Sequence, residues 1–366
     1  MRRRPAAQPG TGDAQAMTVF AADWLDGPAH APRAQPGTAA LLFAAGVLCI
    51  ASVGWLQISA LANTGATLHP SAIVIGTFAA FLVAHALTKR WTLGVPLLIA
   101  GGTVGFAVLR ADVLLGGPLA APLGYANAAG ALFLLAAAAA LLIVARTRTT
   151  GLRIAAAAAA ISFAAVPLLN HTRTATVFAC LIPLGLLART ARGVRLATAV
   201  SGALIVIAFS TTVMLAFAYR AGGTSGAVDG PIDATLSQRR LALWNDALVL
   251  FVENPATGVG PGQFAERGAV PAMDPDSRWP HSEPLHAAAE TGLPGLLLLA
   301  GIVAWAFICL WAGTQDAGTA IVALALGAVG VQASIDYVLH SAALPMITAA
   351  LVAAGARLPG ERGSPP

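Results

Sequence analysis

The sequence predicts an all-α, polytopic integral membrane protein with about ten transmembrane helices and a long outer loop that contains short amphipathic helices. Three observations lead to this fold class: hydrophobic residues make up 57% of the 366 residues, charged residues only 10%, and long apolar runs recur along the chain. A helix needs ~20 apolar residues to cross a hydrocarbon core of ~30 Å, and helices satisfy their own backbone polar groups there. Repeated apolar runs therefore indicate repeated crossings.

Ten apolar runs are expected to form the transmembrane helices, and the sixth and tenth are short. They cover residues 39–61, 70–87, 93–109, 124–145, 152–169, 174–187, 196–218, 292–311, 317–335 and 342–356. Ala, Gly, Val and Leu dominate them, and small residues permit close approach of helices in lipid. Cys49, Cys180 and Cys309 fall within these runs without a paired or metal-binding spacing, so neither a disulfide framework nor a zinc site is expected.

The basic residues predict the orientation, because short cytoplasmic connections carry an excess of Lys and Arg. With the N-terminus inside, 14 of the 21 basic residues lie on the cytoplasmic side. Ten crossings return the C-terminus to the cytoplasm and place the longest polar segment outside. We therefore expect a multi-pass protein of the cytoplasmic (inner) membrane. Its net charge of +5 reflects this topology and not nucleic-acid binding.

These expectations divide the chain into five parts. Residues 1–38, rich in Pro, Ala, Gly and Arg, form a flexible cytoplasmic tail rather than a signal peptide. Helices one to seven occupy 39–218, an extracytoplasmic catalytic loop 219–291, helices eight to ten 292–357, and a cytoplasmic tail 358–366. Function is expected in the loop, because a polar segment of this length is uncommon without a functional reason.

The loop is predicted to contain an amphipathic helix over residues 237–253 that lies along the outer membrane surface. Apolar residues recur there at spacings of three and four, at Leu241, Trp244, Leu248 and Phe251. Ser237 caps its start, and Asn254-Pro255 ends it. Gly258, Gly260 and Gly262 then make a tight turn whose backbone N–H groups can face an anion.

His281 precedes a short predicted helix over residues 283–290, with Ser282 as its N-cap and Gly292 as its C-terminal stop. A helix N-terminus disfavours imidazolium, so a neutral His281 can accept a proton from a hydroxyl. Arg240 and Arg173 are candidate phosphate ligands, since guanidinium groups pair bidentately with phosphate oxygens. The alternative is that His281 only makes hydrogen bonds and that each Arg anchors a helix at the interface.

Several motifs together resemble the O-antigen ligase-like family of bacterial membrane glycan transferases, which includes ligases, polymerases and protein O-oligosaccharyltransferases. In chain order they are Gly124-Tyr-Ala-Asn127, His171-Thr-Arg173-Thr174, Arg240-Leu-Ala-Leu-Trp244, Glu253-Asn-Pro255, Gly258-Val-Gly260-Pro-Gly262-Gln-Phe264, His281-Ser282 and Glu290-Thr-Gly292-Leu-Pro-Gly295. The resemblance covers residues from about 120 to 300 and is most specific around His281. The chain departs from it in being short and in having Ser after His281, where Asn is frequent.

The resemblance implies transfer of a glycan from an undecaprenyl-diphosphate carrier to an acceptor hydroxyl on the outer face of the membrane, without metal or cofactor. His281 would be the general base and Arg173 and Arg240 would stabilise the diphosphate, although the neighbouring Arg239 leaves the choice of Arg open. Trp244, Ser282 and the glycines, including Gly295, would shape the loop. The implied partners are the lipid-linked donor, membrane lipids and a glycan, lipid or protein acceptor, and a flippase is a candidate partner.

Two other function classes stay open at this point. Asp336 and His340 lie close to the end of an apolar run, which a proton-coupled transporter could use. A non-catalytic membrane scaffold for envelope assembly is the third class. Within the transferase chemistry, a polymerase differs from a ligase only in using another lipid-linked repeat as its acceptor. Asp274-Pro275-Asp276 is interpreted as a turn and not as a metal motif.

Overall fold

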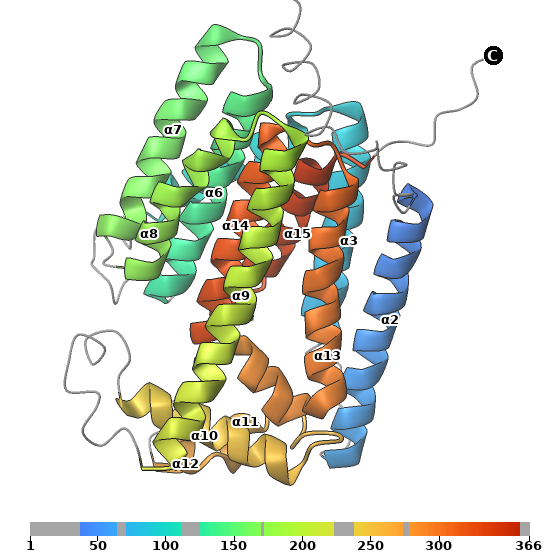
Figure 1. Ribbon diagram of the computed structural model, residues 1–366, viewed down its shortest axis with the longest axis vertical. Helices are drawn as coiled ribbons and strands as arrows, with labels where there is room; N and C mark the ends of the chain where they lie inside the picture. The colour runs from blue at the N-terminus through green and yellow to red at the C-terminus, as the bar shows by residue number, and fades with distance from the viewer. Residues whose placement is uncertain are drawn as a thin grey trace, which may run out of the picture. The chain divides into compact units, whose positions relative to one another are not determined.

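The computed structural model describes residues 37–63, 71–110, 125–169, 172–222, 238–273 and 278–358, and these contain helices but no strand. The helices are α2 (Thr38–Asn63), α3 (Ser71–Arg90), α4 (Gly94–Leu109), α6 (Ala126–Arg146), α7 (Thr150–Leu169), α8 (Arg173–Leu181), α9 (Ala191–Arg220), α10 (Gln238–Glu253), α11 (Phe264–Arg267), α12 (Ala269–Met273), α13 (Glu283–Ala312), α14 (Ala317–Ile335) and α15 (Ala343–Ala356). Two 3₁₀ turns, η2 (Ile182–Leu187) and η3 (Val338–His340), complete them. The predicted all-α fold is confirmed (Figure 1).

Each of the ten predicted apolar runs is helical. Among the described residues, seven helices are long and apolar enough to cross a membrane: α2, α3, α6, α7, α9, α13 and α14. The other three, α4, α8 with η2, and α15, are shorter apolar helices. The number of crossings therefore stays a prediction.

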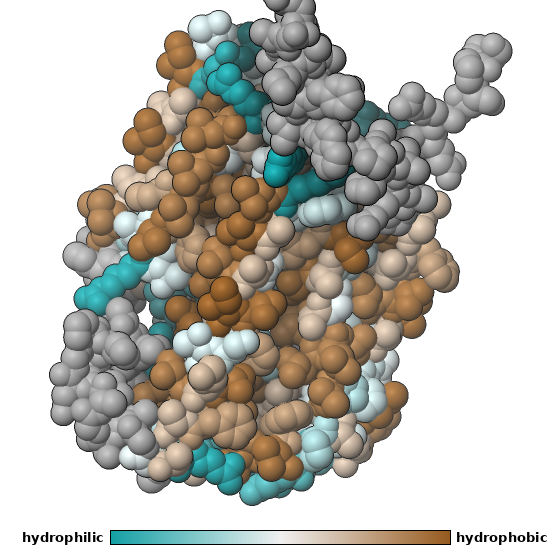
Figure 2. Space-filling model, viewed as in Figure 1, coloured by the Kyte–Doolittle hydropathy of each residue, from teal (hydrophilic) through white to brown (hydrophobic). Residues whose placement is uncertain are grey.

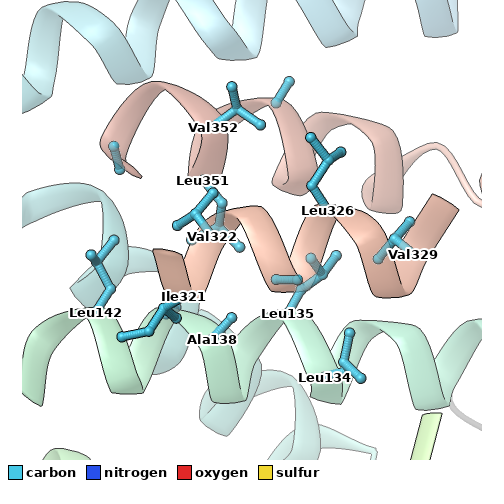
Figure 3. Packing of buried hydrophobic residues seen from close by; sticks show 14 of the residues in the cluster. Leu134, Leu135, Ala138, Leu142, Ile321, Val322, Leu326, Val329, Leu351 and Val352 are labelled. Carbon is cyan, nitrogen blue, oxygen red and sulfur yellow. The ribbon is translucent and has the colours of Figure 1, made fainter. Parts of the chain in front are cut away.

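The centre of the helical unit is formed by α6 and α14. In the most apolar stretch of each helix, 89% of the residues of α6 and 78% of those of α14 are buried. Leu135 and Leu142 of α6 and Ile321 of α14 lie where these two helices meet, and Leu326 of α14 points to the side of Val352 of α15 (Figure 3). Gly327 of α14 and Gly185 of η2 allow close packing, since an added Cβ would lie within 3 Å of Ser201 and Ile321, respectively. Small residues in the apolar runs thus bring helices together, as predicted.

Outward-facing residues of the peripheral helices are mostly apolar. Large exposed side chains include Phe43, Ile50, Ile161 and Ile207. Figure 2 shows apolar residues along the side of the helical bundle, with hydrophilic residues gathered towards its upper end and along its lower edge. Such an apolar surface suits a lipid environment and not water.

Basic residues gather at one end of the helices. Lys89 and Arg357 line the same small cavity, Arg146 contacts Asp316, and Arg195 lies 5.5 Å from the ring centroid of Trp311. The helices α10, α11 and α12 lie at the opposite end, which is the lower end in Figure 1. This separation is the feature on which the predicted orientation depends.

The predicted amphipathic helix over 237–253 corresponds to α10, and Asn254-Pro255 follows its last residue as predicted. Ser237, the predicted cap, lies outside the described residues. The apolar side of α10 does not face lipid: Leu241, Trp244 and Leu248 are buried in a cluster with residues of α9 and α13. The apolar face of α10 is thus covered by protein, and its position along the outer membrane surface stays a prediction.

Candidate active site

The glycine-rich turn after α10 is packed against a kink in α13. Gly292, the predicted helix stop, has φ +68° and interrupts α13 instead of ending it. Gly258 has φ +66°, and a Cβ there would lie 2.2 Å from the carbonyl carbon of Glu290. Backbone hydrogen bonds join the two segments: Val259 N to Ala289 O, Gly260 N to Glu290 O, and Leu293 N to Pro255 O, at 2.8–2.9 Å. Two motifs far apart in sequence thus form one unit.

The anion that the glycine turn binds is the protein's own Glu290 carboxylate. Glu290 Oε2 accepts from Gly262 N at 2.7 Å, and Oε1 accepts from Phe264 N at 3.0 Å. Gly260 and Gly262 hold the turn open to this carboxylate with φ of +103° and +79°. The predicted anion-binding turn is therefore present, and it fixes the loop onto α13. Gly295 lies one turn beyond, where an added Cβ would clash with the Thr291 side chain.

We expect Gly258→Ala to destabilise the protein more than Gly262→Ala. Both residues have positive φ, which costs about 1–3 kcal/mol for an ordinary residue. Only at Gly258 would the new Cβ also collide with backbone atoms, since nothing lies within 4 Å of a Cβ at Gly262. The difference between the two melting temperatures in detergent isolates the close approach. Equal melting temperatures would contradict the packing described here.

The helix α10 presents Arg240 and Trp244 towards His281. Residues four apart share a helix face, which explains the Arg-x-x-x-Trp spacing. Trp244 is fully buried, and its Nε1 donates to the carbonyl oxygen of His281 at 3.1 Å. Arg240 Nη2 lies 3.4 Å from His281 Nδ1. The Trp thus fixes the backbone of His281, while the Arg lies beside its ring.

His281 has a left-handed backbone conformation, with φ +51°, just before α13. Ser282 occupies the N-cap position, as predicted, but its side chain makes no capping hydrogen bond and its buried Oγ has no partner. An ordinary side chain with positive φ is uncommon, although Asn tolerates this region well. The Trp244 bond to its carbonyl oxygen supports this conformation, which turns the imidazole towards α14.

The imidazole meets Asp336, the residue that follows α14. His281 Nδ1 lies 3.0 Å from Asp336 Oδ1, and Arg240 Nη2 lies 3.7 Å from Oδ2. Nδ1 can donate a hydrogen bond to the carboxylate or accept one from Arg240, but it cannot do both. The contact with the buried carboxylate is the shorter of the two, so we assign Nδ1 as a donor to Asp336. Nδ1 therefore carries the proton, and Nε2 carries the lone pair.

Asp336 is held by further donors. Tyr125 Oη donates to both carboxylate oxygens at 2.7 and 2.8 Å, Asn127 Nδ2 donates to Oδ2, and Tyr337 N donates to Oδ1 at 2.8 Å. Burial raises the pKa of the Asp336 carboxyl, but the hydrogen bond from His281 and the charge of Arg240 outweigh this effect and lower its pKa overall. Asp336 is thus a fixed negative charge behind His281.

Aromatic rings enclose this His–Asp pair. The Tyr125 and Tyr337 rings stack with centroids 4.4 Å apart, and the Tyr337 centroid lies 4.7 Å from that of His281. Burial and the charge of Asp336 raise the pKa of Tyr125 above its ordinary value. Tyr125 therefore stays protonated and remains a donor to the carboxylate.

The other predicted phosphate ligands lie elsewhere. Arg239 is exposed on α10, next to the half-buried Arg240. Arg173 is exposed at the first residue of α8, and its neighbour Thr172 lies beside Gly130 of α6. The structure thus brings Arg240 together with His281, while Arg173 and Arg239 occupy exposed positions. Asp274-Pro275-Asp276 lies outside the described residues.

A second polar cluster lies beyond Tyr337. It contains Glu283 and His286 of α13, His340 of η3, and Trp279. The Glu283 Oε1 atom accepts from Leu339 N at 2.9 Å and lies 3.1 Å from His340 Nδ1. Its donor set is one that could hold a metal ion.

Sequence reasoning did not connect Asp336 with His281 and did not single out Tyr337 or Glu283. The available signal was a rare charged residue at the end of an apolar run, followed directly by Tyr. That signal allowed a transporter but favoured an interfacial role. Only the fold places Asp336, the residue after α14, against the segment between α10 and α13.

Comparison with known protein families gives a match over part of the chain. Residues 157–300 match the model of the O-antigen ligase family. This stretch, less than half of the chain, contains Arg173, α10, the glycine turn, His281 and the kink of α13. No curated protein matches the chain. The match agrees with the resemblance drawn from the motifs: residues 157–300 are similar to a family of glycan-transferring membrane enzymes.

Proposed function

We propose that the protein transfers a glycan from an undecaprenyl-diphosphate carrier to an acceptor hydroxyl on the outer face of the cytoplasmic membrane. The carrying observation is the arrangement around His281: a buried carboxylate on Nδ1, a guanidinium beside the ring, and a lone pair on Nε2. Both termini would lie in the cytoplasm and residues 219–291 outside. The O-antigen ligase match supports this reaction class.

In the proposed step, the acceptor oxygen attacks the anomeric carbon while the bond from that carbon to the diphosphate oxygen breaks. The hydroxyl proton passes to His281 Nε2, and Asp336 stabilises the imidazolium that forms. Arg240 pairs with the negative charge that develops on the leaving diphosphate, with Arg173 and Arg239 as further diphosphate ligands. Attack opposite the leaving group inverts the anomeric centre. No metal takes part in this step.

An apolar groove supports a polyprenyl donor. A cavity of about 720 Å³ between α9, α13 and α14 is lined almost entirely by apolar side chains. It extends from Trp311, near the end of α13, to Glu283 and Leu339, beside the candidate site. A polyprenyl chain bound there would present its diphosphate at the same end of the helices as Arg240. Glycan, lipid and protein hydroxyls are all chemically suitable acceptors, and a flippase would supply the donor.

The direct test uses purified protein in liposomes that contain an undecaprenyl-diphosphate-linked glycan. We expect release of undecaprenyl diphosphate only when a hydroxyl acceptor is present, together with a new glycosidic bond. The product length separates the two reactions of this class, since a ladder indicates polymerisation and a single transfer indicates ligation. Release without any new glycoside would contradict the proposal.

Replacing Arg240 by Lys is expected to slow transfer roughly ten- to a hundredfold, because Lys cannot form the bidentate pair with a phosphate oxygen. Arg239→Lys is the matched comparison and should cost less, since Arg239 is exposed and Arg240 is the arginine that lies beside His281. The measurement is the initial transfer rate at saturating acceptor. A larger loss for Arg239→Lys would reverse the assignment of the two arginines.

A further inference from the structure

We infer that Glu283, His286 and His340 form a binding site for one divalent transition-metal ion, with zinc as the best fit. One donor atom from each residue lies within 4.8 Å of the other two. Around tetrahedral zinc, with bonds of ~2.0–2.2 Å, donor atoms are about 3.3–3.6 Å apart. The Glu283 Oε1 to His340 Nδ1 distance of 3.1 Å is already close to this value. Separations of up to 4.8 Å among the three donor atoms would shorten to this value on binding of the ion.

The sequence spacing on α13 suits metal binding. Glu283 and His286 are three residues apart on the first turns of the helix, so both point from one face. A Glu-x-x-His pair of this kind supplies metal ligands in helical bundles. His340 reaches the same point from η3. Two imidazoles and one carboxylate favour zinc over Mg²⁺ or Ca²⁺, which prefer oxygen donors throughout.

The neighbouring residues supply the outer contacts that metal sites use. His286 Nε2 lies 3.0 Å from Glu290 Oε1 without the alignment of a hydrogen bond, and a metal on Nδ1 would leave this carboxylate beside the far nitrogen. A carboxylate on the far nitrogen of a ligating His fixes its tautomer and orientation. Glu290 is itself fixed by the glycine turn. The ring of Trp279 covers the cluster, with its centroid 4.3 Å from that of His340.

An ion can reach this site. The three donor residues line a cavity of about 540 Å³. Three protein ligands leave a fourth position, which water from the cavity would fill. The bound ion would join the start of α13 to η3, which follows Asp336 and Tyr337 directly. The ion thus acts as a structural clamp on the candidate site and not as a participant in transfer.

The test measures metal content and melting temperature. Its outcome therefore does not depend on whether the protein carries out the proposed transfer. Full-length protein is purified through a tag without histidine, equilibrated in a zinc buffer and assayed for bound zinc. We expect close to one zinc ion per wild-type chain and a rise in melting temperature on adding zinc. In His340→Gln, zinc affinity should fall by more than about a hundredfold, beyond the usual cost of losing an outer contact.

His85→Gln is the control, because His85 lines a cavity at the opposite end of the helices and should leave zinc binding unchanged. Glu283→Gln provides a second ligand variant that keeps the side-chain shape. Both ligand variants should melt like wild type in a chelator and fail to gain stability from zinc. Wild-type protein that retains no more zinc than His340→Gln, or variants that gain as much stability from zinc, would overturn the inference.

Discussion

Replacement of His281 by Asn is expected to lower the rate of glycan transfer by about 10²–10⁴-fold, the usual contribution of a general base. Asn is the informative substitution, because His281 has φ +51° and Asn adopts this conformation more readily than Ala does. The Trp244 hydrogen bond to the backbone oxygen is retained in the variant. The measurement is transfer by protein in liposomes, with melting temperature as the check on folding.

His85→Asn is a suitable control, since His85 lies on α3, away from the loop segments. It should transfer glycan at the wild-type rate. A His281→Asn protein that folds and still transfers within a few-fold of wild type would remove His281 from the mechanism. A transporter or scaffold would also tolerate this change, so the result bears on function class as well as on the residue.

Asp336→Asn is expected to reduce both activity and stability. One amide oxygen replaces two carboxylate oxygens that accept from Tyr125, Asn127, Tyr337 and His281. Breaking a buried ion pair by removing one partner costs about 3–5 kcal/mol. Loss of the negative charge also removes the stabilisation of the His281 imidazolium, so the rate constant for transfer should fall much more than the Michaelis constant for the donor changes.

Asp246→Asn is the matched control for Asp336→Asn. Asp246 is also buried and accepts from Val270 N at 2.7 Å, but burial raises its pKa, whereas the pKa of Asp336 is lowered. The charge of Asp336 therefore stabilises the fold above the ordinary Asp pKa of 3.8, and this stabilisation is lost as pH falls through the lowered pKa. Because burial raises the pKa of Asp246, its negative charge destabilises the fold instead of stabilising it. Equal losses of stability in the two variants would contradict this account.

The helical fold and the main motifs could be predicted from the sequence, because long apolar runs and the spacing within α10 are local signals. Arg240 and Trp244 share one helix face by spacing alone, and Asn254-Pro255 marks the end of that helix. Local signals also placed Ser282 at an N-cap position and Gly292 at a break, although the helix continues beyond the break.

Contacts between distant segments could not be predicted in this way. Asp336 is 55 residues from His281 in sequence, and Tyr125 is 211 residues from Asp336. Nothing in the local pattern says that the end of α14 meets the start of α13. The helices that cover the apolar face of α10 could not be predicted for the same reason: an apolar face can be covered by lipid or by other helices, and periodicity alone does not distinguish the two.

The most direct test of glycan transfer is the pool of undecaprenyl-diphosphate-linked glycan in cells that lack this protein, complemented with wild type or with His281→Asn. The account predicts that full-size carrier-linked glycan accumulates on the outer face and that only wild type clears it. An unchanged pool in the deletion strain, or equal clearance by the two proteins, would contradict transfer from this carrier by His281.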